Sequence, residues 1–284
     1  NAFEADIVGL SVMSPAAHNL PEITAGLKAL RPDILIVIGG PHVSAFGGES
    51  LVGNQADVAV VGEGEIVLEN IVRAYLNGRE MADVPGIYRR DRSGAIVHNP
   101  GELPVIKDID ALPPPAYDLI DLSAYWKVQS MPPVPRRRYA SLFSSRGCPY
   151  QCIYCHRIFG DNYRFHSAER IVDEMQYLQR QYKIRDFEFL DDIFNLQKKR
   201  MQQFLNLVGK KNLKPKLVFP NALRADLLTR DEITGLVEAG LYFSSFALET
   251  GSPRLQKLIC KNLDIDKFLE NVAFAASQGV FCNG

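Results

Sequence analysis

Residues 144–155, SSRGCPYQCIYC, decide how the second half of this chain is interpreted. They place Cys148, Cys152 and Cys155 in the spacing C-x3-C-x2-C, although the 284 residues contain only five cysteines. In a chain without a secretion signal, clustered thiols more often bind metal or do redox chemistry than form disulfides. Three thiolates are one ligand short of a closed zinc or iron–sulfur site. The pattern therefore predicts a metal centre with one open position.

Around this loop, strand patterns alternate with helical patterns. One helix begins after Ser167, and another begins with the capping-box pair Thr229 and Glu232. A further helix is expected over 264–279. Apolar strands are expected at 139–145, 186–191, 216–221 and 241–249, with the first residues of a fifth at 280–284. This alternation predicts part of a (β/α) barrel over 139–284, with the cysteine loop at the edge where such barrels place active sites.

The first hundred residues predict a parallel sheet covered on both faces. Three apolar strands are expected at 5–14, 33–44 and 56–65, separated by a helix capped by Asn19 and followed by a helix that ends near Gly78. A short hairpin is expected over 86–100, and the proline-rich stretch that follows suits an extended linker. The predicted domains are therefore 1–100, a linker at 101–138, and 139–284.

Composition narrows the classes of function. With 46% apolar residues, 23% charged residues and a net charge of −1, the chain suits a globular protein and lacks an electrostatic footprint for nucleic acid. Neither a membrane span nor a signal peptide is expected, so a cytoplasmic protein with a small-molecule partner is predicted. Because the chain starts almost on a strand and stops at another, we expect further residues at both ends.

The cysteine motif, with Tyr154 before its last cysteine, resembles the cluster motif of the radical S-adenosylmethionine (SAM) enzymes. The resemblance continues through FGDNYRFHSAERIVDEM, FEFLDDIFN, NALRADLL and ALETGSPRLQKLICKN, which follow the landmarks of radical SAM enzymes with an N-terminal cobalamin domain. It implies a [4Fe–4S] cluster on Cys148, Cys152 and Cys155. The alternative from the residues alone is a zinc site completed by His156 or His166.

The same resemblance implies the residues that contact SAM. Asp191 or Asp192 would accept the SAM ammonium, Arg224 would pair with its carboxylate, and the remaining contacts near the ribose and methionyl part would come from Tyr154, Glu249 and Ser252. Two structural alternatives remain open: Arg224 could form a salt bridge with Asp226, and a neighbouring basic residue could hold Glu249. Arg157, Arg164 and Lys261 are expected to be solvated or structural.

The N-terminal strand ends are small or flexible, and ligands of open α/β sheets bind beyond such carboxyl ends. Together with the linker, they resemble the cobalamin-binding domain of the same enzyme class. The implied cobalamin contacts are Ser11, Met13, Gly39, Gly40, Pro41, His42, Gly62, Glu63 and Gly64. The motif Asp-x-His-x-x-Gly, which supplies a cobalt-ligating histidine in some cobalamin proteins, does not occur in this sequence.

The resemblance implies an enzyme that cleaves SAM reductively and, most simply, a cobalamin-dependent C-methyltransferase that draws electrons from a flavodoxin or ferredoxin. Members of the class that carry out cyclisation or rearrangement are the nearest alternative. A non-catalytic iron–sulfur and cobalamin binding module is a more distant one. No residue is assigned a catalytic role, and the substrate is not identified.

Overall fold

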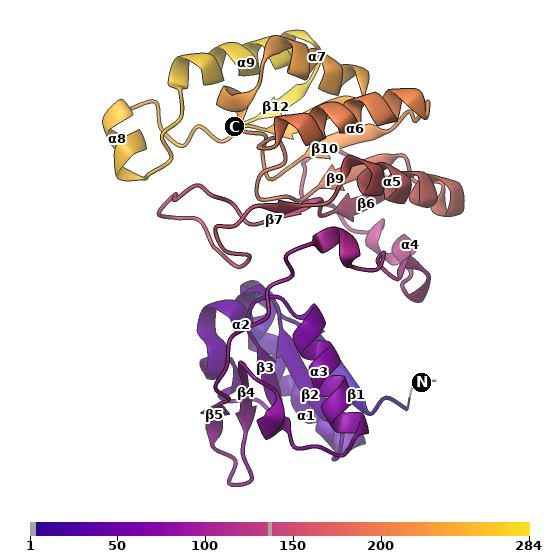
Figure 1. Cartoon of the computed structure of the whole chain (residues 1–284), viewed down its shortest axis with the longest axis vertical. Helices are drawn as coiled ribbons and strands as arrows, with labels where there is room; N and C mark the ends of the chain where they lie inside the picture. The colour runs from indigo at the N-terminus through magenta and orange to yellow at the C-terminus, as the bar shows by residue number, and fades with distance from the viewer. Residues whose placement is uncertain (1–3, 136–137) are drawn as a thin grey trace. The chain divides into compact units, whose positions relative to one another are not determined.

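The chain divides after Ile106 into two units, each with its own five-stranded sheet. The computed structural model describes residues 4–135 and 138–284 (Figure 1). In the part described, no helix is both long and apolar enough to span a bilayer. The fold is α/β, with predominantly parallel strands, as the sequence predicted.

The sheet of the first unit has the order β1-β2-β3-β4-β5, in which β1, β2 and β3 are parallel and the β4–β5 hairpin adds an antiparallel edge. The strands are β1 Ile7–Ser11, β2 Leu35–Gly39, β3 Val58–Val60, β4 Ile87–Arg90 and β5 Ile96–His98. The helices are α1 Leu20–Leu30, α2 Pro41–Phe46 and α3 Glu65–Leu76, with 3-10 turns η1 Ser14–Asn19, η2 Gly47–Leu51 and η3 Met81–Asp83.

Alternation along β2 explains why helices cover both faces of this sheet. Ile36 and Ile38 are fully buried in a cluster with residues of α1, α2 and η2. Val37 points the other way and packs with Val67 and Ile71 of α3. Since successive side chains of a strand face opposite sides, an apolar run such as this one serves two cores at once.

The predicted Asn19 cap is wrong. Helix α1 does begin at Leu20, but Asn19 has helical dihedral angles, φ −85° and ψ −11°, and its side chain makes no capping hydrogen bond. The chain is already turning there because η1 runs directly into α1. An N-cap side chain normally projects from extended backbone, so Asn19 is not placed to act as one.

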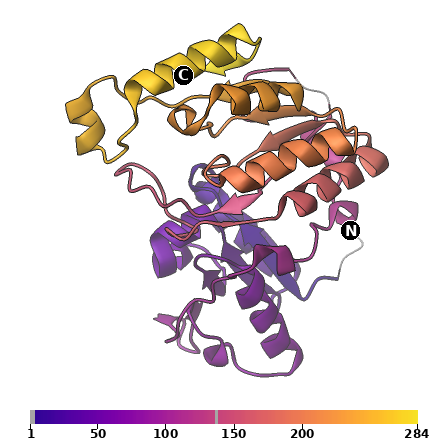
Figure 2. The ribbon, with the colours of Figure 1, turned by 45° about the horizontal axis from the view of Figure 1, so that its top comes forward.

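The second unit carries a sheet in the order β12-β11-β10-β9-β6, in which every pair of neighbours is parallel. Helices α5, α6, α7 and α9 follow one another beside this sheet (Figure 2). The strands are β6 Tyr139–Leu142, β9 Asp186–Phe189, β10 Lys216–Phe219, β11 Leu241–Ser245 and β12 Phe281–Asn283. The helices are α5 Ala168–Tyr182, α6 Lys198–Lys210, α7 Arg230–Glu238, α8 Pro253–Leu258 and α9 Ile265–Ser277, with the 3-10 turn η6 Ala225–Leu227. All five predicted barrel strands are therefore present.

Local capping signals place two of these helices as predicted. The Ser167 hydroxyl accepts a hydrogen bond from the Arg170 amide at the start of α5. At the start of α7, Thr229 and Glu232 form both hydrogen bonds of a capping box. These short motifs act within four residues, so the sequence alone is sufficient to predict them.

The proline-rich segment lies with the second unit in this division. It contains the 3-10 turns η4 Ile109–Ala111 and η5 Tyr117–Leu119 and the short helix α4 Leu122–Tyr125. Asp110 accepts hydrogen bonds from the Ser167 amide and lies 2.9 Å from His166 Nδ1. Tyr117 is buried in the barrel core, so this segment is packed against the barrel rather than extended throughout.

Candidate functional site

A two-stranded antiparallel ribbon closes the base of the cysteine loop. Its strands are β7 Ser145–Arg146 and β8 Arg164–Phe165, and the three cysteines lie in the loop between them. Gly147, at the first loop position, has φ +81°, and a Cβ there would lie 2.4 Å from the Asn162 carbonyl oxygen. Only glycine fits this close approach.

The three cysteines line one cavity of about 230 Å³ beyond the strand ends, together with Asp192 and Asn221. Cys152 is buried, Cys148 half-buried and Cys155 exposed. Burial is the main cause that raises the pKa of the Cys148 and Cys155 thiols, and the neighbouring cysteines raise both further. Iron would offset the mutual repulsion of the thiolates.

Within residues 4–135 and 138–284, no three His, Cys, Asp or Glu side chains are grouped closely enough to hold a single metal ion. In a [4Fe–4S] cluster each thiolate binds a different iron, so its ligands do not converge on one point. Three thiols that line one cavity fit that arrangement and leave one iron open. Of the two histidines considered for zinc, His156 lines the cavity, whereas His166 contacts Asp110.

The two adjacent aspartates after β9 have different environments. Asp192 lines the cysteine cavity, and its carboxylate lies 3.8 Å from His156 Nε2. Asp191 is 2% exposed and accepts hydrogen bonds from the hydroxyls of Ser144 and Ser145. Of the two candidates for the SAM ammonium, Asp192 is therefore the one whose carboxylate is accessible from the cavity.

Arg224 adopts the structural alternative considered from the sequence. Its Nε lies 3.0 Å from an Asp226 carboxylate oxygen, and its Nη2 donates to the Lys261 carbonyl at 3.1 Å. The guanidinium also stacks on the ring of Tyr150, 3.7 Å from its centroid. These contacts join the cysteine loop to the segment after α8 and use the Nε and Nη2 groups of Arg224.

Glu249 lies beside the cysteine loop in a left-handed backbone conformation, with φ +63°. Its Oε1 accepts hydrogen bonds from the Tyr154 hydroxyl at 3.1 Å and from Lys261 Nζ at 3.0 Å. The hydrogen bond from Lys261 is the largest cause that lowers the pKa of Glu249. A non-glycine residue held at positive φ is often found at a binding site.

Lys261 was expected to be solvated or structural, and it is structural: its side chain is 12% exposed and forms a salt bridge with Glu249. It is therefore the neighbouring basic residue considered from the sequence as holding Glu249. Its position could not be read from the sequence, because it depends on the fold of the turn after α8. Ser252 has a structural use: its hydroxyl accepts from the Leu255 amide and caps α8.

In the first unit, the parallel strands bring the predicted cobalamin contacts together at the carboxyl ends of the strands, here called the ligand edge of the sheet. Ser11 at the end of β1 pairs in register with Gly39 at the end of β2. The β2–β3 pairing places Gly62 two residues beyond β3 on the same edge. Gly40 has φ +92°, and a Cβ there would lie 2.9 Å from the Ser11 hydroxyl oxygen and the Val12 nitrogen.

The remaining predicted cobalamin contacts lie next to these strand ends. Met13 is exposed, Pro41 opens α2, and Glu63 and Gly64 precede α3, with Glu63 buried. His42 packs against Phe46 with the two rings tilted by 38° and their centroids 4.6 Å apart, and its Nδ1 lies 3.3 Å from the Ser14 hydroxyl. These strand ends therefore offer partly exposed backbone at small residues, which suits a bulky ligand.

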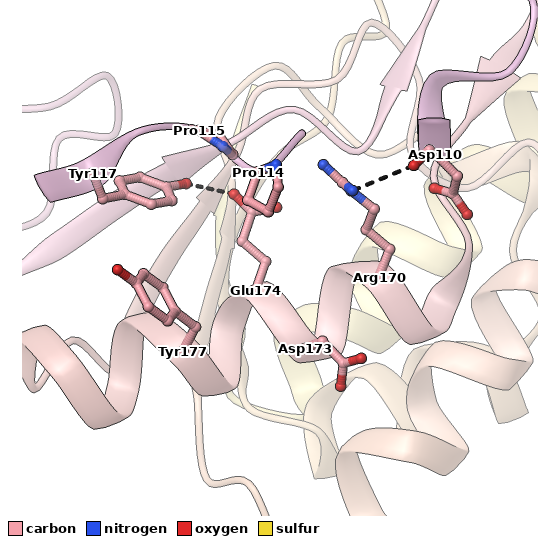
Figure 3. A pocket seen from close by; sticks show the side chains of 8 residues that line it. All are labelled: Asp110, Pro114, Pro115, Tyr117, Arg170, Asp173, Glu174 and Tyr177. Carbon is pink, nitrogen blue, oxygen red and sulfur yellow. Dashed lines mark hydrogen bonds between the residues drawn. The ribbon is translucent and has the colours of Figure 1, made fainter. Parts of the chain in front are cut away.

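A larger cavity, about 630 Å³, lies between the segment 110–117 and α5, away from the cysteines (Figure 3). The Tyr117 hydroxyl donates to Glu174 at 2.5 Å, and Arg170 donates to the Asp110 and Pro113 carbonyls. These bonds fasten the segment to the helix. None of the residues predicted to bind SAM or cobalamin lines this cavity.

Models of two protein families match the two units of this chain. The model of the radical SAM superfamily matches residues 142–283, and that of the B12 binding domain matches residues 1–72. The first match spans the sheet of β9 to β12 and the cysteine loop. The second spans the three parallel strands β1 to β3.

Individual relatives cover nearly the whole chain. An uncharacterized methyltransferase of Pyrococcus horikoshii is 29% identical over 99% of this chain and 60% of its own length. An anaerobic magnesium-protoporphyrin IX monomethyl ester cyclase of Rubrivivax gelatinosus is 28% identical over 97% of this chain and 49% of its own length. The chain thus spans between about half and three fifths of these relatives.

Among solved structures, the radical SAM methyltransferase TsrM from Kitasatospora setae, with cobalamin and a [4Fe–4S] cluster bound, superposes with a TM-score of 0.76. The match covers 99% of this chain and 56% of that protein, at 20% sequence identity. It shows that the two proteins share a fold.

Proposed function

This chain belongs to the radical SAM superfamily, and from that premise we propose that it is the cofactor-binding part of a cobalamin-dependent radical SAM methyltransferase. One observation carries the proposal: Cys148, Cys152 and Cys155 line a single cavity together with Asp192, which follows the parallel strand β9. With the cofactors bound, the available chemistry is one-electron cleavage of SAM and methyl transfer from cobalamin.

The residues of this chain would bind and orient the cofactors. Cys148, Cys152 and Cys155 would hold a [4Fe–4S] cluster, and Asp192 would accept the SAM ammonium. Glu249 and Tyr154 would contact the ribose, with Lys261 holding the carboxylate of Glu249 in its ionised form. The sheet edge at Ser11, Gly39 and Gly62 would receive cobalamin through backbone groups.

A methyl transfer is favoured because one relative and one solved structure of the same fold are methyltransferases. The match to the B12 binding domain adds a domain that could bind the methyl carrier. The cyclase of Rubrivivax gelatinosus keeps a second candidate open, namely a cyclisation carried out by the same two units. A small-molecule substrate, a flavodoxin or ferredoxin as electron donor and a cytoplasmic location are part of the proposal.

The test is anaerobic reconstitution with iron and sulfide, followed by an assay for 5'-deoxyadenosine and methylated product against candidate lipids, tetrapyrroles and natural-product precursors. Cys148→Ala should abolish SAM cleavage. Cys260→Ala is the matched control, because Cys260 lies outside the cluster motif, and it should leave the iron content unchanged. Loss of iron in Cys260→Ala would contradict the ligand set, and cyclised rather than methylated product would favour the second candidate.

A further inference from the structure

A buried polar cluster lies directly below the cysteine loop. It consists of Ser144, Ser145, Asp191 and Arg200, each only 2% exposed. Asp191 Oδ1 accepts from the Ser144 hydroxyl at 2.8 Å and from the Ser145 hydroxyl. From α6, Arg200 donates to the Ser144 carbonyl at 2.9 Å and to the Ser144 hydroxyl at 2.8 Å. The Ser144 hydroxyl thus links the two charged groups.

This cluster contacts both strands of the ribbon that closes the cysteine loop. Ser145 is the first residue of β7, so Asp191 bonds to the chain three residues before Cys148. The Arg200 guanidinium lies 5.5 Å from the ring centroid of Phe165 in β8 and 4.9 Å from that of Phe194. One strand is therefore held by hydrogen bonds and the other by a cation–π contact.

Burial of two charged groups is a costly way to stabilise a fold, and apolar packing often does as well. A buried charged group can nevertheless fix the geometry of the groups bonded to it, since a carboxylate accepts hydrogen bonds only along defined directions. Here the directions are set by Asp191, which lies two residues after β9, and by Arg200 in the helix α6. The cluster thereby fixes where the cysteine loop leaves the barrel.

We propose that Asp191 and Arg200 are positioning residues that hold the base of the cysteine loop through Ser144 and Ser145, while the adjacent Asp192 alone faces the cavity. The inference rests on the proposed function, because it concerns the loop that would carry the cluster. Residues that orient metal ligands without touching the metal commonly affect metal affinity by about 10- to 100-fold.

The experiment compares iron loss from the reconstituted full chain to a chelator in four proteins: wild type, Asp191→Ala, Asp191→Asn and Asn271→Ala. Asp191→Ala removes the acceptor and should release iron about tenfold faster than wild type. Asp191→Asn keeps an oxygen that can accept from both serines, so its rate should stay within about twofold of wild type. The electron paramagnetic resonance spectrum of the reduced cluster, with and without SAM, should change in the alanine variant alone.

Asn271→Ala is the control for general destabilisation. Asn271 is buried in the same unit, and its side chain donates to the Ala225 and Leu228 carbonyls rather than to a residue of the cysteine loop. It should lower the melting temperature while leaving the rate of iron loss unchanged. Iron loss from Asp191→Ala that matches wild type, or that merely follows melting temperature as in Asn271→Ala, would overturn the proposal. Equal loss in the asparagine and alanine variants would do the same. Failure of the wild-type chain to hold iron would instead count against the proposed function.

Discussion

At the scale of single residues, substitutions at two adjacent glycines of the first unit should have different effects: one should impair ligand binding and the other should impair stability. A Cβ on Gly39 would meet the Val60 carbonyl oxygen at 3.7 Å, an ordinary contact, whereas one on Gly40 would meet Val12 and Ser11 at 2.9 Å. We expect Gly39→Val to keep the fold and to lose cobalamin, because its side chain occupies the ligand edge. Equilibrium dialysis of cobalamin, with circular dichroism as the fold control, checks this.

Gly40→Val is the informative counterpart. Because Gly40 also has φ +92° and ψ −173°, this substitution should strain the backbone, destabilise the first unit by roughly 1–3 kcal/mol and lower its melting temperature. The proposed cobalamin edge would be mistaken if Gly39→Val bound cobalamin as wild type does.

The Lys261–Glu249 pair predicts a pH effect on SAM binding. The pKa of Glu249 is lowered, chiefly by the hydrogen bond from Lys261. Because the pKa is lowered, the stabilisation that ionised Glu249 gains from Lys261 is fully present above the ordinary pKa of a glutamate. It is lost as the pH falls through the lowered pKa of Glu249. Lys261→Met should therefore move the acid limb of SAM binding to higher pH and weaken binding near neutral pH. Isothermal titration across pH 4–8 measures both.

The matched control for that measurement is Lys257→Met, which removes the same charge from an exposed position on α8. It should leave the acid limb in place. An unshifted profile in Lys261→Met would remove Glu249 from the list of SAM contacts.

Residue types were easier to predict than their partners. The cysteine spacing singled out three side chains that do line one cavity. The neighbours Asp191 and Asp192 could not be told apart, because one meets serines more than forty positions away in the sequence. Arg224 likewise depends on Tyr150 and on the carbonyls after α8. Pairings across distant segments are set by the fold and leave no local signal.

At the scale of elements, the ribbon β7–β8 makes the loop sensitive to its first residue. Gly147→Ala would place a Cβ 2.4 Å from the Asn162 carbonyl oxygen and should open the base of the loop. We expect it to retain little iron after reconstitution. Iron and sulfide analysis, with circular dichroism of the same samples, provides the measurement.

Gly160→Ala is the control that distinguishes the steric clash at Gly147 from the cost of a positive φ. Gly160 lies in the same loop with φ +72°, yet a Cβ there would meet nothing within 4 Å. Gly160 lines the cysteine cavity, but within the protein Gly160→Ala carries only the conformational cost, roughly 1–2 kcal/mol, and it should retain more iron than Gly147→Ala. Similar iron retention in both variants would show that the close approach at Gly147 does not matter.

Elements whose signals are local were predicted well, and the others were not. The Ser167 and Thr229 caps are formed as expected, since each motif spans one helical turn. The Asn19 cap failed because a 3-10 turn precedes it, and the sequence pattern SPAAHN did not reveal that turn. The β7–β8 ribbon went unpredicted because each of its strands has only two residues.

At the scale of the whole molecule, the two units have separate cores. Among the residues that the structure describes, the apolar clusters of the first unit contain none from the second, and the barrel cluster contains none from the first. A ligand that binds one unit should therefore stabilise that unit by mass action and leave the other unchanged. We expect calorimetry to resolve two transitions, one raised by cobalamin and the other lowered by iron removal.

The assignment of those transitions can be checked with Gly39→Val and Cys148→Ala. The first should abolish the shift caused by cobalamin, and the second should abolish the shift caused by iron removal. A single transition that responds to both ligands would show that the units unfold together and would contradict this view.

The strand order β12-β11-β10-β9-β6 follows the order of the chain, and this has a consequence for synthesis on the ribosome. Each new strand of this sheet pairs with the strand of the same sheet that precedes it in the chain, so after β9 no strand needs a partner that is made later. During translation, N-terminal parts are made first and can fold before the rest of the chain has emerged. We expect stalled nascent chains to acquire protease resistance stepwise, one strand–helix unit at a time. Resistance that arises only after β12 has emerged would show that the sheet is instead assembled all at once.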